Sequence, residues 1–451
     1  MKLFDDRDFY RDLFTVAIPI MLQNLVNAAV NMADTIMIGR LGTVEIAAVG
    51  IGNNVFFLYS IILFGVTSGG SIFTAQFWGK RDIAGIRRNT GFCLLLNIAI
   101  GILFTLAALL APEGILRIYS RDPAVITAGG VYLKSLAPSF IPFAVSQVFF
   151  LTLRSIEEVR IPMIGTFIAL SVNVVFNYFL IFGAGPFPAM GVRGAAIATV
   201  MARALETVFL IAISYGGKYA LAGSLRELTA FNAVYVRRFF SICLPVIFNE
   251  IIWSLGVTIH NIIFARTGTD AIAAFNIVST VSQLTWVLFI GLGNGVGVLI
   301  GKRIGSGDER GARNYAARIV RFAPLLAVGA AFVLVPVSRL LPLVFNASQA
   351  VFSGAALMLI ILSVSYPFRA FNMSMVIGIC RAGGDTVFCA FYDNFFMWCV
   401  ALPAAAAAAF IFKSPVWVIY LCVSSEEFLK VILGLSRSRS GKWLHNVTTG
   451  I

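Results

Sequence analysis

The sequence predicts an all-α membrane protein whose twelve transmembrane helices form two pseudo-symmetric six-helix bundles. Of its 451 residues, 59% are hydrophobic and 12% are charged, a composition well outside that of ordinary water-soluble domains. Apolar runs approaching the ~20 residues that cross a bilayer recur along the chain, separated by short polar linkers. The two halves of the chain also match each other at a fixed spacing. Together these features indicate a duplicated membrane protein.

Charged or Pro/Gly-containing segments delimit each expected helix. The first apolar run follows Phe4-Asp5-Asp6-Arg7-Asp8, which lacks the basic start of a signal peptide, so we retain that run as a helix. The expected helices in the first half are 13–38, 46–78, 88–111, 125–153, 161–183 and 192–215. Those in the second half are 238–264, 272–301, 314–337, 350–380, 386–412 and 415–436.

The repeat has a spacing of 226 residues. Ala17-Ile18-Pro19-Ile20 recurs as Cys243-Leu244-Pro245-Val246, and the same register matches Gly65 to Gly291, Gly79 to Gly305 and Asp82 to Asp308. Because six helices are an even number, both halves enter the membrane from the same side, and their symmetry axis runs along the membrane normal. We therefore expect an N-lobe at 1–215, a cytoplasmic linker at 216–238, and a C-lobe with a cytoplasmic tail at 239–451.

The net charge of +13 does not indicate nucleic-acid binding, because the basic residues concentrate in alternate linkers. This bias follows the positive-inside rule and places both termini in the cytoplasm of a protein of the inner (plasma) membrane. The expected partners are the lipid bilayer and a small amphipathic or cationic molecule, and we expect a monomer. With two histidines, no C-x-x-C and no G-x-S-x-G motif, the sequence predicts no metal centre, no cofactor and no enzyme activity.

Polar residues line one face of the first helix. Gln23, Asn27, Asn31 and Asp34 occur at i, i+4, i+8 and i+11. A charge at bilayer depth costs about 2.5–3.5 kcal/mol, so Asp34 is expected to face a cavity or a partner. Because desolvation penalises the charged form, Asp34 is suited to carry a proton or to hold a cation. The alternative is that Asp34 pairs with Arg40 at the outer end of the helix.

The equivalent positions of helix seven are Asn249, Trp253, Val257 and His260, so polar groups remain at its two ends. We predict that a substrate cavity is lined by Gln23, Asn27, Asn31, Asn249 and His260. Glu250 lies about a turn beyond Pro245 and is the second candidate for coupling to a proton or cation. Its alternative role is a hydrogen-bonded carboxyl that holds helices together.

Further polar residues fall within the expected helices. Asn173 and Asn177 are four residues apart, and their amides are expected to coordinate a cation or to bind Asp34, with interhelical hydrogen bonding as the alternative. Arg203 and Glu206 are expected to pair with each other. Arg369 and Asp393 are expected at comparable depth, where they could form a buried pair. Bonds to neighbouring helices are expected for Glu426, Glu427 and Lys430, with substrate contact as the alternative.

These residues resemble the multidrug and toxic compound extrusion (MATE) transporters over nearly the whole chain. The resemblance rests on 31–39 with 47–50, Leu153-Arg154 with 160–163, 173–178 with 181–183, Gly191 with 194–196, 381–385 and 427–430. It implies an exporter of amphipathic, often cationic, compounds in exchange for protons or sodium ions, with Asp34 at the coupling site. Asn177 departs from the aspartate of the proton-linked branch, and Arg369 from the aspartate of the sodium-linked branch.

We therefore expect a secondary active antiporter that works by alternating access, with Asp34, Asn173, Asn177 and Glu250 as the coupling residues. The alternative is a lipid-linked precursor flippase of the same superfamily, in which more cationic residues would occupy the spans. A major-facilitator transporter is a further rival, because the loop 79–88 resembles its loop between helices two and three. The second copy of that loop at 305–313 makes a coincidence the better explanation.

Overall fold

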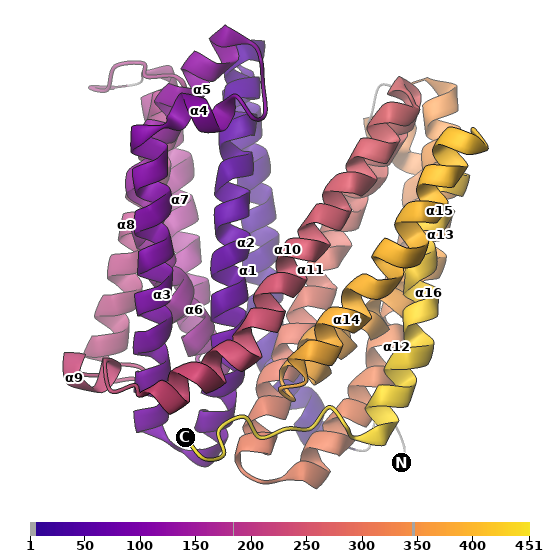
Figure 1. Cartoon of the computed structure of the whole chain (residues 1–451). Coiled ribbons are helices and arrows are strands. Elements are labelled where there is room, and N and C mark those ends of the chain that lie inside the picture. The colour runs from indigo at the N-terminus through magenta and orange to yellow at the C-terminus, as the bar shows by residue number, and fades with distance from the viewer. Residues whose placement is uncertain (1–5, 184, 345–347) are drawn as a thin grey trace. The chain divides into compact units, whose positions relative to one another are not determined.

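The computed structural model describes residues 6–183, 185–344 and 348–451, and its ordered elements are helices (Figure 1). The helices of the first half are α1 (Arg7–Gly39), α2 (Thr43–Lys80), α3 (Ile83–Leu110), α4 (Pro112–Leu116), α5 (Pro123–Leu136), η1 (Ala137–Ser139), α6 (Phe140–Ser155), α7 (Arg160–Phe182), α8 (Val192–Gly216) and α9 (Leu225–Leu228). Those of the second half are α10 (Ala233–Thr267), α11 (Thr269–Gly305), α12 (Glu309–Val344), α13 (Gln349–Met373), η2 (Ser374–Arg381), α14 (Thr386–Phe396), η3 (Met397–Ala401), α15 (Leu402–Ala406), η4 (Ala407–Ile411) and α16 (Val416–Ser440).

Eleven helices of the described chain are long and apolar enough to cross a membrane, and they correspond to the first eleven expected spans. Some are composite: α5, η1 and α6 run together as one span, and α13 continues into the π-helical segment η2. The twelfth expected span corresponds to α16, which has 25 residues but carries Glu426, Glu427 and Lys430. The predicted all-α, multi-pass membrane fold is confirmed.

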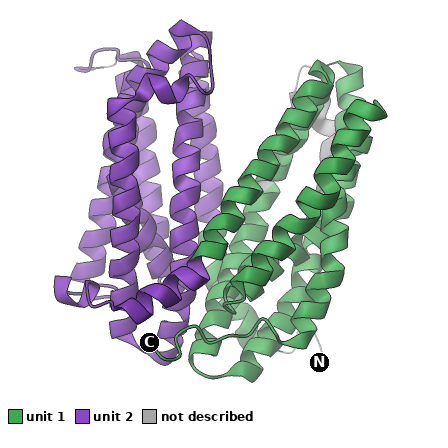
Figure 2. Ribbon diagram, viewed as in Figure 1, with its two compact units in different colours: residues 1–21, 244–450 green, residues 22–243, 451 purple. Residues whose placement is uncertain are grey.

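The chain divides into two compact units (Figure 2). Unit 1 comprises Met1–Met21 and Leu244–Gly450, and unit 2 comprises Leu22–Cys243 with Ile451. The predicted lobes placed the division in the linker at 216–238, whereas the units divide inside α1 and α10. Both divisions lie within three residues of the prolines inside these helices, Pro19 and Pro245. Because proline removes a backbone hydrogen bond, it allows a helix to change direction there.

The first turns of α1 therefore belong to the core of unit 1. Phe9 is fully buried and its ring meets that of Tyr315 edge to face, with the centroids 4.7 Å apart. Arg318 forms an ion pair with Asp6. Leu13 and Ala17 are fully buried in the same apolar cluster, which is otherwise built from residues of the second half.

The first turns of α10 belong to unit 2 in the same way. Tyr235 is fully buried, and its hydroxyl donates to Oδ1 of Asn89 over 2.6 Å. Phe239 stacks on Phe73 with the ring centroids 5.7 Å apart. The preceding linker is also tied to this unit, because Arg87 on α3 binds Glu227 on α9. Hydrogen bonds from Ser224 and Arg87 hold the pKa of the exposed Glu227 carboxyl below its usual range.

The structure preserves the 226-residue repeat in the turns between helices. The carboxylates of Asp82 and Asp308 each accept a hydrogen bond over 2.8 Å from the backbone N–H three residues later. Gly42 and Gly268 precede α2 and α11, and both have a φ of +149°. This backbone region is essentially restricted to glycine, so the duplicated glycines are required by the turn itself.

Gly268→Ala is expected to lower the free energy of unfolding by about 1–3 kcal/mol, the usual cost of such a backbone conformation. A Cβ at position 268 meets no atom within 4 Å, so the loss would report backbone strain alone. The measurement is denaturation of the detergent-solubilised protein by SDS, followed by tryptophan fluorescence. Gly50→Ala is the matched control: it lies inside α2 in open space, where alanine should stabilise the helix by up to about 1 kcal/mol. Equal effects of both substitutions would contradict the assignment.

The last residues of the described chain pack onto unit 1. Trp443 and Val447 are fully buried, and the N–H of His445 donates to the carbonyl of Gly383 over 2.8 Å. Arg437 near the end of α16 binds both carboxylate oxygens of Asp385, over 2.7 and 2.9 Å. These contacts fix the turn between η2 and α14, and with it the position of the neighbouring Arg381.

Candidate functional site

Asp34 lies in the second half of α1 within unit 2, where two amides of α7 surround its carboxylate. The side-chain nitrogen of Asn177 donates to Oδ1 of Asp34 over 2.7 Å. With its amide turned so that nitrogen faces the carboxylate, Asn173 lies 3.1 Å from Oδ1 and 3.2 Å from Oδ2. Both asparagines are buried, and Asp34 itself is half-buried. The structure thus brings together the three residues that the sequence grouped, and Arg40 forms no ion pair with Asp34 among the described residues.

The surroundings of Asp34 make its charge state adjustable. Arg203 and Tyr132 lie within electrostatic range of the carboxylate. The amide of Asn173 also lies 3.4 Å from the hydroxyl of Thr199 on α8. A partly desolvated carboxylate that retains two amide neighbours can exist as an ion or accept one positive charge. Amide groups suit both states, because each supplies donors to a carboxylate and an oxygen acceptor to a cation or an acid proton.

Gln23 on the same helix belongs to a separate, packed network. It is 1% exposed, donates to the hydroxyl of Thr166 over 2.6 Å, and accepts from Arg154 over 2.6 Å. Thr166 in turn donates to Glu206 over 3.1 Å, and Glu206 accepts from Arg203 over 2.9 Å. The expected Arg203–Glu206 pair is confirmed.

The structure places the predicted cavity residues of α1 in different settings. Gln23 is enclosed by α6, α7 and α8 through the bonds just described. Asn27 is half-buried and Asn31 is exposed, and neither forms a side-chain hydrogen bond within the described chain. The polar face predicted for α1 is therefore partly or fully exposed only beyond Gln23, from Asn27 to Asp34. That these residues contact substrate stays a prediction.

Glu250 in unit 1 is ion-paired with Arg381, which lies at the end of the π-helical segment η2. The guanidinium is 6% exposed and the carboxylate side chain 13% exposed. From the sequence, Arg381 was expected in the cytoplasmic loop after the helix 350–380, so its pairing with Glu250 was not predicted. Because its carboxylate already binds a buried arginine, Glu250 fits the alternative role of a carboxyl that holds helices together. A coupling role for Glu250 stays a prediction.

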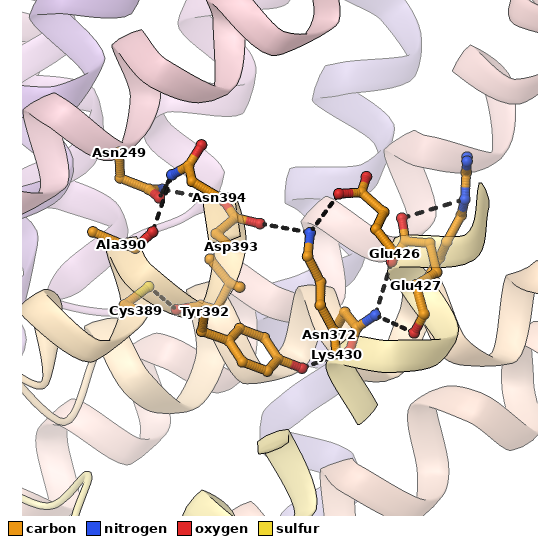
Figure 3. A network of polar contacts seen from close by, with 12 residues as sticks. Asn249, Asn372, Cys389, Ala390, Tyr392, Asp393, Asn394, Glu426, Glu427 and Lys430 are labelled. Carbon is orange, nitrogen blue, oxygen red and sulfur yellow. Dashed lines mark hydrogen bonds and ion pairs between the residues drawn. The ribbon is translucent and has the colours of Figure 1, made fainter. Parts of the chain in front are cut away.

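A larger polar network links α10, α14 and α16 (Figure 3). Asn249 donates to Oδ2 of Asp393 over 3.2 Å and accepts from Asn394 over 2.6 Å. The ammonium group of Lys430 lies between two carboxylates, 3.4 Å from Asp393 and 3.3 Å from Glu426. The ammonium is therefore held between α14 and its own helix.

The same network continues to α13. Glu427 accepts from the side chain of Asn372 over 2.8 Å, and Nε of Arg369 lies 3.5 Å from its other carboxylate oxygen. The hydroxyl of Tyr392 donates to Oδ1 of Asn372 over 2.6 Å. The expected Arg369–Asp393 pair is wrong, because each residue has a partner on α16. The expectation that the charged residues of α16 bond to neighbouring helices is confirmed.

His260, the remaining predicted cavity residue, is buried in α10 at 7% exposure. Its Nε2 has no hydrogen-bond partner in the part of the chain that the structure describes. Arg369 and Lys430 lie within electrostatic range of the ring. Asn249, eleven residues earlier in α10, is 2% exposed and belongs to the network of Figure 3. Neither residue lines an open surface.

The networks of the two units occupy matching positions of the repeat. Gln23 and Asn249 are 226 residues apart, and the next pairs are 227 apart: Arg154 with Arg381, Thr166 with Asp393, and Arg203 with Lys430. Each copy joins an early polar residue of its first helix to the same later position, Thr166 in one and Asp393 in the other. The repeat could have identified Arg154 and Arg381 from the sequence, had the register been allowed to shift by one residue.

Comparison with known proteins adds to these observations. A family model described as MatE matches residues 19–179 and 245–418, one segment in each half of the chain. An uncharacterized transporter of Bacillus subtilis, YisQ, is 24% identical over 438 residues, covering 96% of this chain and 94% of that protein. A probable multidrug resistance protein NorM of Mesorhizobium japonicum is 27% identical over 424 residues, covering 90% and 88%.

Solved structures show the same fold. A multidrug resistance MATE family transporter of the MOP superfamily, in an outward-facing conformation, superposes with a TM-score of 0.87 at 18% identity, with 96% of both chains covered. A MATE structure in complex with MaL6 gives a TM-score of 0.88 at 18% identity, again with 96% of both chains covered.

Proposed function

Because the chain belongs to the MatE family, whose members are transporters and not enzymes, we propose that it is a multidrug efflux antiporter with its coupling site at Asp34. It exports amphipathic, cationic molecules in exchange for protons or sodium ions by alternating access. It does so as a monomer of the inner membrane with both termini in the cytoplasm. Multidrug export is supported by the similarity to NorM proteins, which are described as probable multidrug resistance proteins.

The observation that carries the coupling proposal is the contact of Asp34 with Asn173 and Asn177. This group joins α1 to α7, so a change in the charge of Asp34 alters what holds these helices together. When Asp34 is ionised, two amide donors bind it. Once it takes a proton or a cation, these charge-assisted hydrogen bonds weaken, and α1 can shift relative to α7. A ligand can drive such a shift only through its different affinity for the two arrangements.

Efflux should be measured with the purified protein in liposomes loaded with a fluorescent organic cation. We expect export to be driven by an imposed proton gradient or by an imposed sodium gradient, and to cease when that gradient is collapsed by an ionophore. The relative effect of the two gradients names the coupling ion. Movement of a labelled lipid-linked precursor instead of the cation would contradict the proposal and support a flippase.

A further inference from the structure

We propose that unit 1 contains a second proton site, in which Glu426 on α16 holds a proton beside Asp393 and Lys430. The site is distinct from Asp34, which belongs to unit 2. It is made of side chains from α14 and α16 and is surrounded by α10 and α13 (Figure 3). Protonation of one carboxylate oxygen of Glu426, with the proton taken from water, removes one negative charge from the group.

The buried charges of unit 1 do not balance. The buried networks of unit 1 contain four carboxylates, Glu250, Asp393, Glu426 and Glu427, and three cations, Arg369, Arg381 and Lys430. Two of the carboxylates have a cation of their own, since Arg381 binds Glu250 and Arg369 binds Glu427. Asp393 and Glu426 share Lys430, so one negative charge is left over. In unit 2 the corresponding charges balance, because the two cations Arg154 and Arg203 equal in number the two carboxylates Glu206 and Asp34.

Buried acceptors on α10, α14 and α16 lack hydrogen-bond donors within the described chain. Glu426 is 7% exposed, and its Oε2 makes no hydrogen bond in the described chain, its contact being the 3.3 Å ion pair with Lys430. Oδ1 of Asn394 and Nε2 of His260, each in a residue 7% exposed, are also without a hydrogen-bond partner there. An unpaired buried acceptor costs about 1–3 kcal/mol. A proton on Glu426 converts one of these acceptors into a donor.

The repeat relates this site to the Asp34 site of unit 2. At a spacing of 226 residues, the position of Asp34 is occupied in unit 1 by His260. At a spacing of 227, Glu426 occupies the position of Thr199, whose hydroxyl lies 3.4 Å from Asn173 in the Asp34 site. The carboxyl of unit 1 therefore lies on the last helix of its repeat. In unit 2 the matching residue, Thr199, is separated from the carboxyl of Asp34 by the side chain of Asn173. The two units contain related sites with the acid moved from the first helix to the sixth.

A proton fits this site better than a metal ion. The space between the carboxylates of Asp393 and Glu426 already holds the ammonium group of Lys430. The carboxylates carry one negative charge too many, and the place for a cation between them is already filled. The other charged groups within electrostatic range of Glu426 are Glu427 on its own helix and Arg369 on α13. His260 on α10 lies within range of Arg369 and Lys430. A proton on Glu426 neutralises the group, so that no unpaired charge is buried.

The test reads protonation directly and needs no transport. Infrared difference spectra of the purified protein, recorded between acidic and alkaline pH, detect the carbonyl band of protonated carboxylic acids. We expect a band that is lost as the pH rises and that Glu426→Gln removes. Glu206→Gln is the matched control, because Glu206 is equally buried but bound by Arg203 and Thr166, and it should leave the band unchanged.

A second variant guards against misfolding of Glu426→Gln. Lys430→Met removes the shared cation, so the group should take up a further proton and the band should grow. A band that persists unchanged in both variants would overturn the proposal. Loss of the band on replacing choline with sodium at constant pH would also overturn it, by assigning a metal ion. Because Asp34→Asn leaves this band in place, failure of the second site and failure of the proposed coupling at Asp34 are distinguishable.

Discussion

Replacing Asp34 with asparagine is expected to abolish gradient-driven efflux while leaving the protein folded. The substitution keeps the shape of the side chain and its place next to Asn177, but removes the group that can change its charge. Initial efflux rates in liposomes, under the gradient that drives the wild type, should fall to the level of liposomes without protein. Binding of the fluorescent cation to the detergent-solubilised protein should persist, because only the coupling charge has been removed.

Asp270→Asn is the control for this variant. Asp270 is an exposed residue in the first turn of α11 and has no buried partner among the described residues, so the same change in formal charge should leave the efflux rate intact. Should Asp34→Asn export the cation at the wild-type rate under the same gradient, the coupling site must lie elsewhere. The second carboxyl site in unit 1 would then be the next position to test.

The second large effect concerns stability. Arg381→Met is expected to lower the free energy of unfolding by about 3–5 kcal/mol, because it leaves Glu250 as an unpaired charge at a buried position. The measurement is SDS denaturation of the detergent-solubilised protein. Adding Glu250→Gln to the same chain should recover much of the loss, since the double variant no longer contains a buried, unpaired ion.

A solvent-exposed ion pair provides the comparison. Arg11 and Asp8 lie 3.0 Å apart with side chains 71% and 72% exposed, so Arg11→Met should change the unfolding midpoint little. If Arg381→Met were no more destabilising than Arg11→Met, the buried pair would contribute nothing, and Glu250 would regain its place as a candidate for coupling.

The sequence was sufficient to predict the spans and the Asp34 group. Apolar runs and polar linkers determine the helices, and the i, i+4 spacing of Asn173 and Asn177 puts both amides on one face of α7. The high cost of leaving a carboxylate against lipid indicated a cavity or a partner for Asp34, and these amides were one of the expected partners. The Arg203–Glu206 pair was predictable because the two residues are three apart on one helix, so their geometry is local.

The partners of Arg369 and Arg381 could not be predicted by counting residues. Depth was estimated by counting along regular helices, but η2 is a π-helix, which has a wider turn than an α-helix. Arg381 is the last residue of η2 and is buried against Glu250. Likewise Arg369 binds Glu427 because α13 packs along α16, a neighbour that no spacing within the sequence identifies.

The division of α1 between the two units sets an order of events during synthesis. Residues 7–21 emerge from the ribosome before residues 22–243, yet their packing partners are in 244–450, which are made after both. At about 5–20 residues per second, translation of the intervening residues 22–243 takes roughly 10–45 s. During this interval the apolar side chains of Phe9, Leu13 and Ala17 have no native surface to cover them. The start of the chain must therefore be held by lipid or by the insertion machinery until the second half arrives, and separately expressed halves would each lack the segment that completes their core.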